Sequence, residues 1–179
     1  MPDLVIRPAV QDDLEVLWDF LAMAASEPHA EAAKAEPLVA KYLVGWQRPG
    51  DFGVIAAQNG EILGAAWARR FSTAELRSPY GDEATPKVSI GVKPEARGQG
   101  VGEQLMRTLI GEAVRRGLGL CLSVRTENPA RRLYERLGFR EIRGSAVTNR
   151  AGSISIGMVL ERPTAGNSDT GAPSSYPPC

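Results

Sequence analysis

The chain has 179 residues, a length typical of one compact domain, and 43% of them are hydrophobic, which is enough for a sizeable core. Lysine plus arginine and aspartate plus glutamate each number 21, so the net charge does not indicate a nucleic-acid or membrane-surface partner. The sequence contains no membrane-span-length apolar run, no secretory signal pattern, two cysteines and one histidine. These features argue against a disulfide framework, a metal centre and a serine–histidine–aspartate triad, and they predict a cytoplasmic protein.

Helix-like and strand-like patterns alternate along the first half of the chain. Helices are predicted where apolar residues recur every three or four positions, and strands where short apolar runs end at turn residues. Asn59-Gly60 lies between two such runs and predicts a β-hairpin, because both central positions of a type I′ turn need positive φ. The predicted elements are a strand at 4–7, a helix from Asp12 that ends before Ser26, a helix over Leu38–Trp46, strands at 52–57 and 61–67, and a loop at 71–86. Trp18, Trp46 and Trp67 fall on the apolar faces and are expected in the core.

A strand–helix–strand–helix unit and two further strands follow the loop. These elements are predicted at 87–92, 100–116, 119–124, 129–137, 139–143 and 153–160. Cys121 lies on a predicted buried strand and is expected to be an inert small hydrophobe. Residues 163–179 are rich in Pro, Ser, Gly and Thr and contain Cys179, so we expect a disordered, non-catalytic tail after a single domain at 1–162.

Three glycines at alternate positions follow the strand at 87–92 and open the next helix. Glycine lets a ligand approach the backbone closely, and the N–H groups at a helix start favour an anion, so this loop predicts a phosphate site. It is not a P-loop, because Gly102 is followed by Glu103 and Gln104, and its G-x-G-x-G spacing differs from the dinucleotide fingerprint. A tight turn alone would also explain the glycines. Ten arginines and five acids lie within 97–143, either as a local positive field for a phosphorylated ligand or as solvated helix faces.

A second motif, Asn128-Pro-Ala-Arg-Arg-Leu-Tyr134-Glu-Arg-Leu-Gly-Phe139, follows farther along the chain. Together with V-x-P-x-x-R-G-x-G-x-G at 92–102, it resembles the GNAT superfamily of acetyl-CoA-dependent N-acetyltransferases. The order of elements from residue 4 to 160 is similar as well. The resemblance implies a single-domain α/β fold with a mixed, mostly antiparallel, splayed sheet and helices on both faces.

The resemblance also implies an acetyl-CoA site. The strand before the loop would pair with the pantetheine arm through the backbone of Ile90, Gly91 and Val92. Arg97 would add positive charge near the pyrophosphate. The loop residues whose N–H groups would hold the pyrophosphate are Gly98, Gln99, Gly100, Val101, Gly102 and Glu103. Asn128 would touch the cofactor, and Tyr134 would contact it and protonate the leaving thiolate as the catalytic residue; the structural alternative is a core tyrosine with a satisfied hydroxyl.

The sequence departs from the family pattern in two respects. Asn128 precedes Tyr134 by six positions, whereas many relatives have seven. Relatives that acetylate protein amines often carry a glutamate base on one of the two splayed strands, but the matching positions here are Pro86-Lys87 and Ser123. The remaining candidates for the base are water ordered by Ser89 or Ser123 and three loop acids, Glu75, Asp82 and Glu83, which are more commonly solvated surface charges.

The expected function is transfer of an acetyl group from acetyl-CoA to a primary amine by direct attack in a ternary complex, with no metal. The alternative is a non-catalytic acetyl-CoA- or CoA-binding regulatory module, which the missing strand carboxylate allows. The acceptor would lie between the loops 25–37 and 71–86, and His29 lies in the first of these, although a lone loop histidine is usually solvent-exposed. No nucleic-acid or membrane partner is expected, because aromatic residues do not alternate with the basic ones. A homodimer is considered because family members commonly dimerise.

Overall fold

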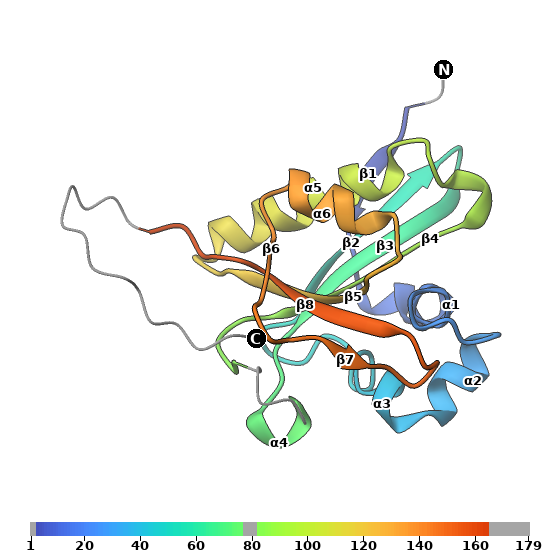
Figure 1. The fold of residues 1–179 in the computed structure, drawn as a ribbon. Coiled ribbons are helices and arrows are strands. Elements are labelled where there is room, and N and C mark those ends of the chain that lie inside the picture. The colour runs from blue at the N-terminus through green and yellow to red at the C-terminus, as the bar shows by residue number, and fades with distance from the viewer. Residues whose placement is uncertain (1–2, 77–81, 165–179) are drawn as a thin grey trace. The chain divides into compact units, whose positions relative to one another are not determined.

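The computed structural model describes residues 3–76 and 82–164 (Figure 1). The chain forms two compact units, one of Met1–Arg70 with Val88–Glu112 and the other of Phe71–Lys87 with Ala113–Cys179. The predicted tail at 163–179, apart from its first two residues, lies outside the described residues, and so does the middle of the predicted loop at 71–86. Within the described ranges, no helix is long and apolar enough to cross a membrane.

The described residues contain eight strands, which belong to one mixed sheet. They are β1 (Val5–Pro8), β2 (Phe52–Gln58), β3 (Glu61–Arg69), β4 (Lys87–Val92), β5 (Leu120–Arg125), β6 (Arg140–Glu141), β7 (Val147–Thr148) and β8 (Ile154–Leu160). Hydrogen bonds connect them in the order β1-β2-β3-β4-β5-β8-β6, and β7 pairs with β8. β4 and β5 pair in parallel at Lys87 and Cys121, whereas β1–β2, β2–β3, β5–β8, β6–β8 and β7–β8 are antiparallel. The predicted α/β class with a mostly antiparallel sheet is confirmed.

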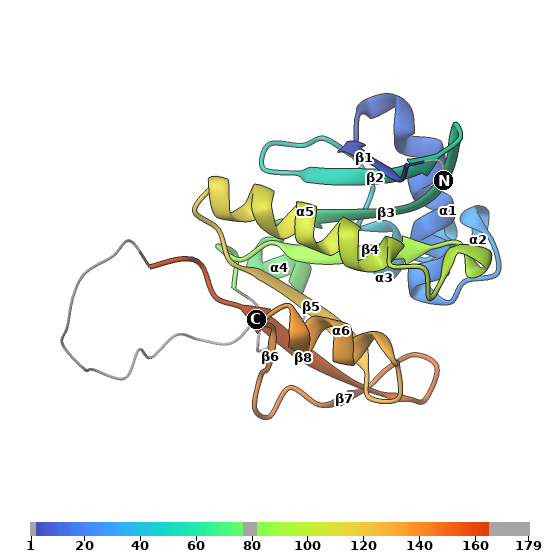
Figure 2. The same cartoon turned by 90° about the horizontal axis from the view of Figure 1, so that it is seen from above.

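The first unit contains β1 to β3, most of β4, and helices on both sides of these strands. Its helices are η1 (Gln11–Asp13), α1 (Leu14–Ala25), α2 (Ala30–Ala35), α3 (Pro37–Ala40), η2 (Pro94–Ala96) and α5 (Val101–Arg115), the last of which ends in the second unit. Within this unit, α5 lies on one side of the strands and α1 and α2 lie on the other (Figures 1 and 2). The helix predicted at 100–116 is confirmed within a residue at each end, and Gly117 follows it with a φ of 67°.

Close packing between α1 and β4 depends on a glycine. A Cβ placed on Gly91 would lie 2.5 Å from the carbonyl oxygen of Phe20, which no side chain could tolerate without a backbone shift. On the neighbouring strand, a Cβ on Gly64 would lie 2.9 Å from the Gly91 carbonyl oxygen and 3.0 Å from Leu105. The two glycines therefore allow α1 and α5 to approach the strand pair β3–β4 closely.

The predicted core and hairpin of the first unit are confirmed. Trp18, Trp46 and Trp67 are all buried in one apolar cluster. Asn59 and Gly60 have φ values of 53° and 78°, as a type I′ turn requires, and they connect β2 to β3.

The helix predicted over Leu38–Trp46 is wrong in its bounds. The structure has α2 and the one-turn α3 instead, and turns from residue 41 to 47. Glu36 is extended and Pro37 opens α3, because proline is accepted at the first helical position but not inside a helix. Gly45 and Gln47 adopt positive φ values of 68° and 66°, which end any regular helix there. The apolar residues do recur at helical spacing, but Pro37 and the two positive φ values prevent one continuous helix.

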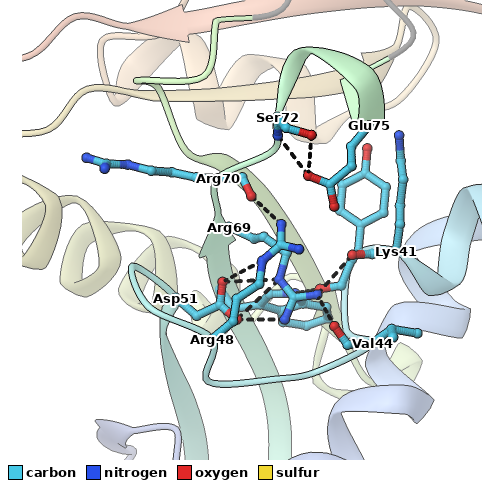
Figure 3. Close-up of polar contacts among 10 residues, drawn as sticks. Lys41, Val44, Arg48, Asp51, Arg69, Arg70, Ser72 and Glu75 are labelled. Atoms are coloured by element: carbon cyan, nitrogen blue, oxygen red, sulfur yellow. Dashed lines mark hydrogen bonds and ion pairs between the residues drawn. The ribbon is translucent and has the colours of Figure 1, made fainter.

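A buried ion pair holds these turns against the end of β3. Arg69 and Asp51 have side chains that are 0% and 1% exposed, and Arg69 Nη2 lies 2.6 Å from Asp51 Oδ2 (Figure 3). The other terminal nitrogen of Arg69 donates to the carbonyl oxygens of Lys41 at 2.9 Å and Val44 at 2.7 Å. One guanidinium therefore ties together β3, the turns before β2 and the residue that precedes β2.

The second unit contains β5 to β8, α4 (Thr73–Leu76) and α6 (Ala130–Arg136). Cys121 is buried, as predicted, and its N–H donates to the Pro86 carbonyl oxygen at 2.9 Å. The strand predicted at 139–143 shortens to β6, because Gly144 turns the chain with a φ of 79°. β7 was not predicted, since a two-residue strand has no periodicity to detect.

Candidate functional site

The predicted phosphate loop lies in the first unit between β4 and α5. Gly98 and Gly100 have φ values of 74° and 82°, a region that favours glycine, and a Cβ on either would meet no atom within 4 Å. The turn therefore explains why these positions are glycine, and the open space above them leaves the backbone accessible to a ligand. Helical geometry leaves the N–H groups of Val101 and Gly102 without an acceptor inside α5. The loop is suited to hold a phosphate through backbone donors.

The strand predicted to pair with pantetheine leads directly into this loop. Ile90 and Val92 of β4 are half-buried and Gly91 is buried. The residue after the strand, Lys93, donates its N–H to the Leu63 carbonyl oxygen at 2.8 Å, which continues the contact with β3. The first unit thus brings together the predicted strand residues and the predicted loop residues.

The side chains of the loop are held by local hydrogen bonds. Arg97 Nε donates to the carbonyl oxygen of Val92 at 3.2 Å, and Gln99 Nε2 donates to the carbonyl oxygen of Glu95 at 2.7 Å. Glu103 pairs with Arg107 one turn later, at 2.7 Å. This pair partly neutralises the acid nearest the predicted pyrophosphate position, and the Arg97 guanidinium is exposed beside the loop.

The arginine excess of residues 97–143 divides between the two interpretations. Exposed ion pairs involve Arg107 with Glu103, Arg131 with Glu135 and Glu141, and Arg140 with Glu161. These arginines behave as solvated helix and strand faces. Arg97 has no carboxylate partner among residues 3–76 and 82–164, so it is available to add positive charge at the loop.

Tyr134 lies in the second unit on α6. Its side chain is buried, at 6% exposure, and packs edge-to-face against Phe139 with ring centroids 6.0 Å apart. Burial raises the pKa of Tyr134 to about 12, because the phenolate would lose its hydration. Among the described residues, no protein group makes a hydrogen bond to the hydroxyl, and the choice between a catalytic tyrosine and a core tyrosine stays a prediction. The phenol is a neutral donor at physiological pH.

Asn128 lies two residues before α6 in the same unit. Its Oδ1 accepts a hydrogen bond from the Ala130 N–H at 2.9 Å, and its carbonyl oxygen accepts from the Arg131 N–H at 3.0 Å. The side-chain oxygen therefore supports the start of the helix, a common role for asparagine. Its amide nitrogen is exposed with the rest of the residue and is the group left for a ligand.

The candidates for the general base differ in their surroundings. Ser89 on β4 is buried, whereas Ser123 on β5 is exposed. The loop acids take part in hydrogen bonds that shape their own segment. Glu75 accepts from the N–H and hydroxyl of Ser72, Asp82 accepts from the Ala84 N–H and the Thr85 hydroxyl, and Glu83 accepts from Thr73. The hydrogen bonds from Thr73 lower the pKa of Glu83, which makes that carboxylate a weaker base.

A cavity in the first unit is lined in part by the loop 25–37, where the acceptor was expected, and by no described residue of the loop 71–86. It has a volume of about 270 Å³ and lies between α1, the start of α2 and the end of β4. His29, which the sequence placed beside an acceptor site, is one of the lining residues, together with Asp19, Glu27 and Lys93; we refer to these four polar lining residues as the rim. The helical spacing of Val16, Asp19 and Phe20 on α1 could have indicated one polar residue within an apolar face. The position of Lys93 at the cavity depends on how β4 packs, and it could not have been predicted from the sequence.

Within the described residues, no group of three or more His, Cys, Asp or Glu side chains is arranged to hold a metal ion.

Comparisons with known proteins agree with this arrangement. Residues 49–141 match the family model described as acetyltransferase (GNAT) domain. A mycothiol acetyltransferase from Acidothermus cellulolyticus is 31% identical over 157 residues, which cover 82% of this chain and 47% of that protein. A second mycothiol acetyltransferase, from Pseudarthrobacter chlorophenolicus, is 31% identical over 140 residues, covering 75% of this chain and 42% of that protein. The chain therefore spans less than half the length of these relatives.

Solved structures share the fold along most of the chain. The ribosomal-protein-S18-alanine N-acetyltransferase from Escherichia coli superposes with a TM-score of 0.68 at 25% identity and covers 94% of this chain and 99% of its own. The Salmonella typhimurium protein yncA, whose structure contains acetyl-CoA as its cofactor, has a TM-score of 0.67 at 22% identity and covers 97% of this chain and 99% of its own. At 22% identity, the similarity to yncA shows a shared fold only.

Proposed function

The chain belongs to the GNAT acetyltransferase family, and on this premise we propose that it transfers an acetyl group from acetyl-CoA to a primary amine. The observation that carries the proposal is the loop at 98–103. Its two left-handed glycines face open space, and it joins β4 to the start of α5 in the order that the family requires. The acetyl-CoA bound in the yncA structure supports the same cosubstrate here.

Backbone groups of the first unit would bind the cofactor. The loop N–H groups would hold the pyrophosphate, and the exposed Arg97 guanidinium would add a compensating charge. The backbone of Ile90, Gly91 and Val92 would pair with the pantetheine arm. A free N–H of this strand would also stabilise the negative charge that develops on the thioester oxygen during attack.

The reaction would proceed by direct attack. The neutral amine nitrogen bonds to the thioester carbonyl carbon, the carbon–sulfur bond breaks, and the CoA sulfur leaves as a thiolate. The nitrogen then releases one proton to solvent as the amide forms and the thiolate takes up one, so the protons balance. An ordinary thiol has a pKa of ~8.5, so proton transfer from a phenol of pKa about 12 is unfavourable in water. Burial of the thiolate would raise its pKa in the same way as it raises that of Tyr134. We therefore assign Tyr134 the role of hydrogen-bond donor and proton source for the departing sulfur.

The amine must lose a proton before it attacks. Glu75, Asp82 and Glu83 are already hydrogen-bonded within their own loop, which disfavours them as the base. The remaining candidate for the base is a water molecule ordered by Ser89, which is buried, or by Ser123, which is exposed. The non-catalytic alternative has weaker support, because the matching family model and the matching relatives are described as acetyltransferases.

Thermal unfolding with acetyl-CoA tests the cofactor. A ligand at a hundred times its Kd adds ~2.7 kcal/mol to the stability of the folded state. For a chain of this size we expect Tm to rise by roughly 5–11 °C with acetyl-CoA and not with ATP. No rise at millimolar acetyl-CoA or CoA would contradict the proposal.

Tyr134→Phe then separates catalysis from binding. The variant keeps the ring packed against Phe139 but lacks the hydroxyl, so Kd for acetyl-CoA should remain within about twofold. General acid groups typically contribute ~10²–10⁴-fold, so kcat should fall by at least about 100-fold. Unchanged turnover would remove Tyr134 from the mechanism, and no turnover in the parent protein with any amine would favour the non-catalytic module.

A further inference from the structure

The cavity in the first unit combines an apolar wall with a charged rim. Val16, Phe20 and Met23 supply the apolar wall from one face of α1, at positions three and four residues apart. Its volume of about 270 Å³ is just below the range of ~300–1,000 Å³ typical of sites for drug-sized molecules. The cavity therefore suits a small aliphatic group.

Two carboxylates lie at the rim. Asp19 is exposed and makes no hydrogen bond within residues 3–76 and 82–164, whereas Glu27, after the end of α1, is half-buried. Asp19 lies on the same face of α1 as the apolar residues of the wall. A cation inside the cavity would therefore lie among residues that include two carboxylates.

The basic groups at the rim are already compensated. Lys93 Nζ lies 2.7 Å from Glu61 Oε1, and Glu61, Glu95 and Asp19 all raise the pKa of Lys93. His29 Nδ1 accepts a hydrogen bond from the Ala32 N–H at 3.2 Å. Asp19, Glu27 and Glu61 carry three negative charges against the one positive charge of Lys93, so this group of residues would repel an anion.

The cavity lies next to the strand that is expected to carry the thioester. Phe20 lines the cavity, and its carbonyl oxygen lies 2.5 Å from the position of a Cβ on Gly91 of β4. Lys93, also at the rim, directly follows Val92. Both contacts lie within the first unit, so they connect the cavity to the predicted acetyl-CoA strand without a contribution from the second.

We propose that this cavity recognises the second cationic group of a diamine acceptor, with Asp19 and Glu27 as specificity-determining residues. This inference rests on the proposed acetyl transfer. The methylene chain of the acceptor would contact Val16, Phe20 and Met23, and its non-reacting ammonium would lie between the two carboxylates. The amine that attacks the thioester must be neutral, whereas the ammonium at the carboxylates has an ordinary pKa of ~10.4 and stays charged at pH 7. The two carboxylates therefore bind the non-reacting ammonium and not the amine that reacts.

Equilibrium binding tests the inference independently of catalysis. Isothermal titration of the intact chain with 1,4-diaminobutane and with n-butylamine compares two ligands of equal carbon number that differ in one ammonium. A charge-assisted hydrogen bond to a carboxylate should make the diamine bind about 10-fold or more tightly than the monoamine. Equal affinities would overturn the proposal.

Charge-removing variants locate the effect. Asp19→Asn and Glu27→Gln should each weaken diamine binding by about 10-fold and change monoamine binding by less than about twofold. The matched control is Asp12→Asn, which removes an exposed carboxylate from η1 outside the cavity and should leave both affinities unchanged. Ala30→Leu fills the cavity from α2 and should weaken both amines, and Tm of each variant checks its folding. Diamine binding that tolerates both Asp19→Asn and Glu27→Gln would overturn the assignment.

Kinetics with the parent protein separates failure of this inference from failure of the proposed function. If acetyl-CoA raises Tm and n-butylamine is acetylated as efficiently as the diamine, acetyl transfer stands and the diamine site fails. If acetyl-CoA does not bind, the proposed function fails, whereas diamine binding that depends on Asp19 still supports a cation site.

The same ammonium could come from a free diamine or from a lysine side chain. Peptides that begin Ala-Lys and Ala-norleucine differ only in that charge. Acetylation of the lysine peptide at least about 10-fold more efficiently than of the norleucine peptide would identify a protein source. A free diamine is identified if 1,4-diaminobutane shows the dependence on Asp19 and the peptides do not differ.

Discussion

Replacing Arg69 with methionine should destabilise the first unit strongly. Methionine fills much of the space of the arginine side chain but has no charge and no N–H donor. The change would leave Asp51, which is 1% exposed, without its close cationic partner, and it would remove the donors to the carbonyl oxygens of Lys41 and Val44. The energetic effect is therefore that of breaking a buried ion pair, rather than that of making a cavity.

The expected magnitude follows from the remaining contacts of Asp51. Breaking a buried ion pair from one side costs about 3–5 kcal/mol, because a charge is left unpaired in the interior. Arg48 Nε lies 3.9 Å from Asp51 Oδ1 and would compensate weakly. We therefore expect Arg69→Met to lower the free energy of unfolding by about 3 kcal/mol, the lower end of this range. For a chain of this size, that loss corresponds to a fall in Tm of roughly 6–12 °C.

Urea unfolding measured by tryptophan fluorescence is the appropriate assay. Trp67 Nε1 donates to the carbonyl oxygen of Tyr42 at 3.1 Å, so the fluorescence reports on the turns that Arg69 holds. Arg140→Met is the control, since it breaks an exposed pair with Glu161 and should cost less than about 1 kcal/mol. Arg69→Met combined with Asp51→Leu removes both charges and should recover more than half of the loss. The reasoning is refuted if Arg69→Met and Arg140→Met destabilise equally.

Three further predictions concern a second ion pair, the buried tyrosine and the close approach of α1 to β4. The hydrogen bond from Arg7 lowers the pKa of Asp13, so this carboxylate stabilises the fold above its unfolded pKa of ~3.9 and the stabilisation is lost as pH falls through the lowered folded value. Asp13→Asn should therefore cost about 1–2 kcal/mol at pH 7 and less at pH 3 in urea titrations, and an equal cost at both pH values would contradict the assignment. Burial raises the pKa of Tyr134 to about 12, so the unfolded chain loses this proton first and stability should fall between about pH 10 and pH 12 by up to about 2.7 kcal/mol. Tyr134→Phe should abolish that part of the slope in alkaline unfolding curves, whereas identical slopes would mean that the phenol is not buried. Gly91→Ala places a methyl group against the Phe20 carbonyl oxygen and should lower Tm by several degrees while also weakening acetyl-CoA binding, and a Tm within about 1 °C of the parent would show that α1 does not pack closely on β4.

Local signals in the sequence predicted those features that depend on neighbouring residues. Asn59-Gly60 predicts its hairpin because positive φ is a property of the two residues themselves. The apolar spacing along 100–116 predicts α5 to within one residue at each end because helical periodicity persists over several turns. The apolar spacing over Leu38–Trp46 led to a wrong helix prediction, because Pro37 and two residues with positive φ interrupt the helix without changing the apolar pattern.

The candidate site divides in the same way. The phosphate loop could be predicted because its glycines, the strand before it and the helix after it are adjacent in the sequence. The roles of Asn128 and Tyr134 in acetyl-CoA binding and catalysis stay predictions.

The sequence by itself determined the hairpin, the helix α5, the glycine loop and the family to which the chain belongs, because each is encoded in short stretches of adjacent residues. Only the tertiary structure decided that Arg69 pairs with Asp51 inside the first unit, and that Asp19 and Lys93 share a cavity rim. These residues are many positions apart in the sequence, and the residues next to a charged side chain do not indicate which group it will pair with. Burial and proximity, which give such groups their energy and their chemistry, arise only when distant segments pack together.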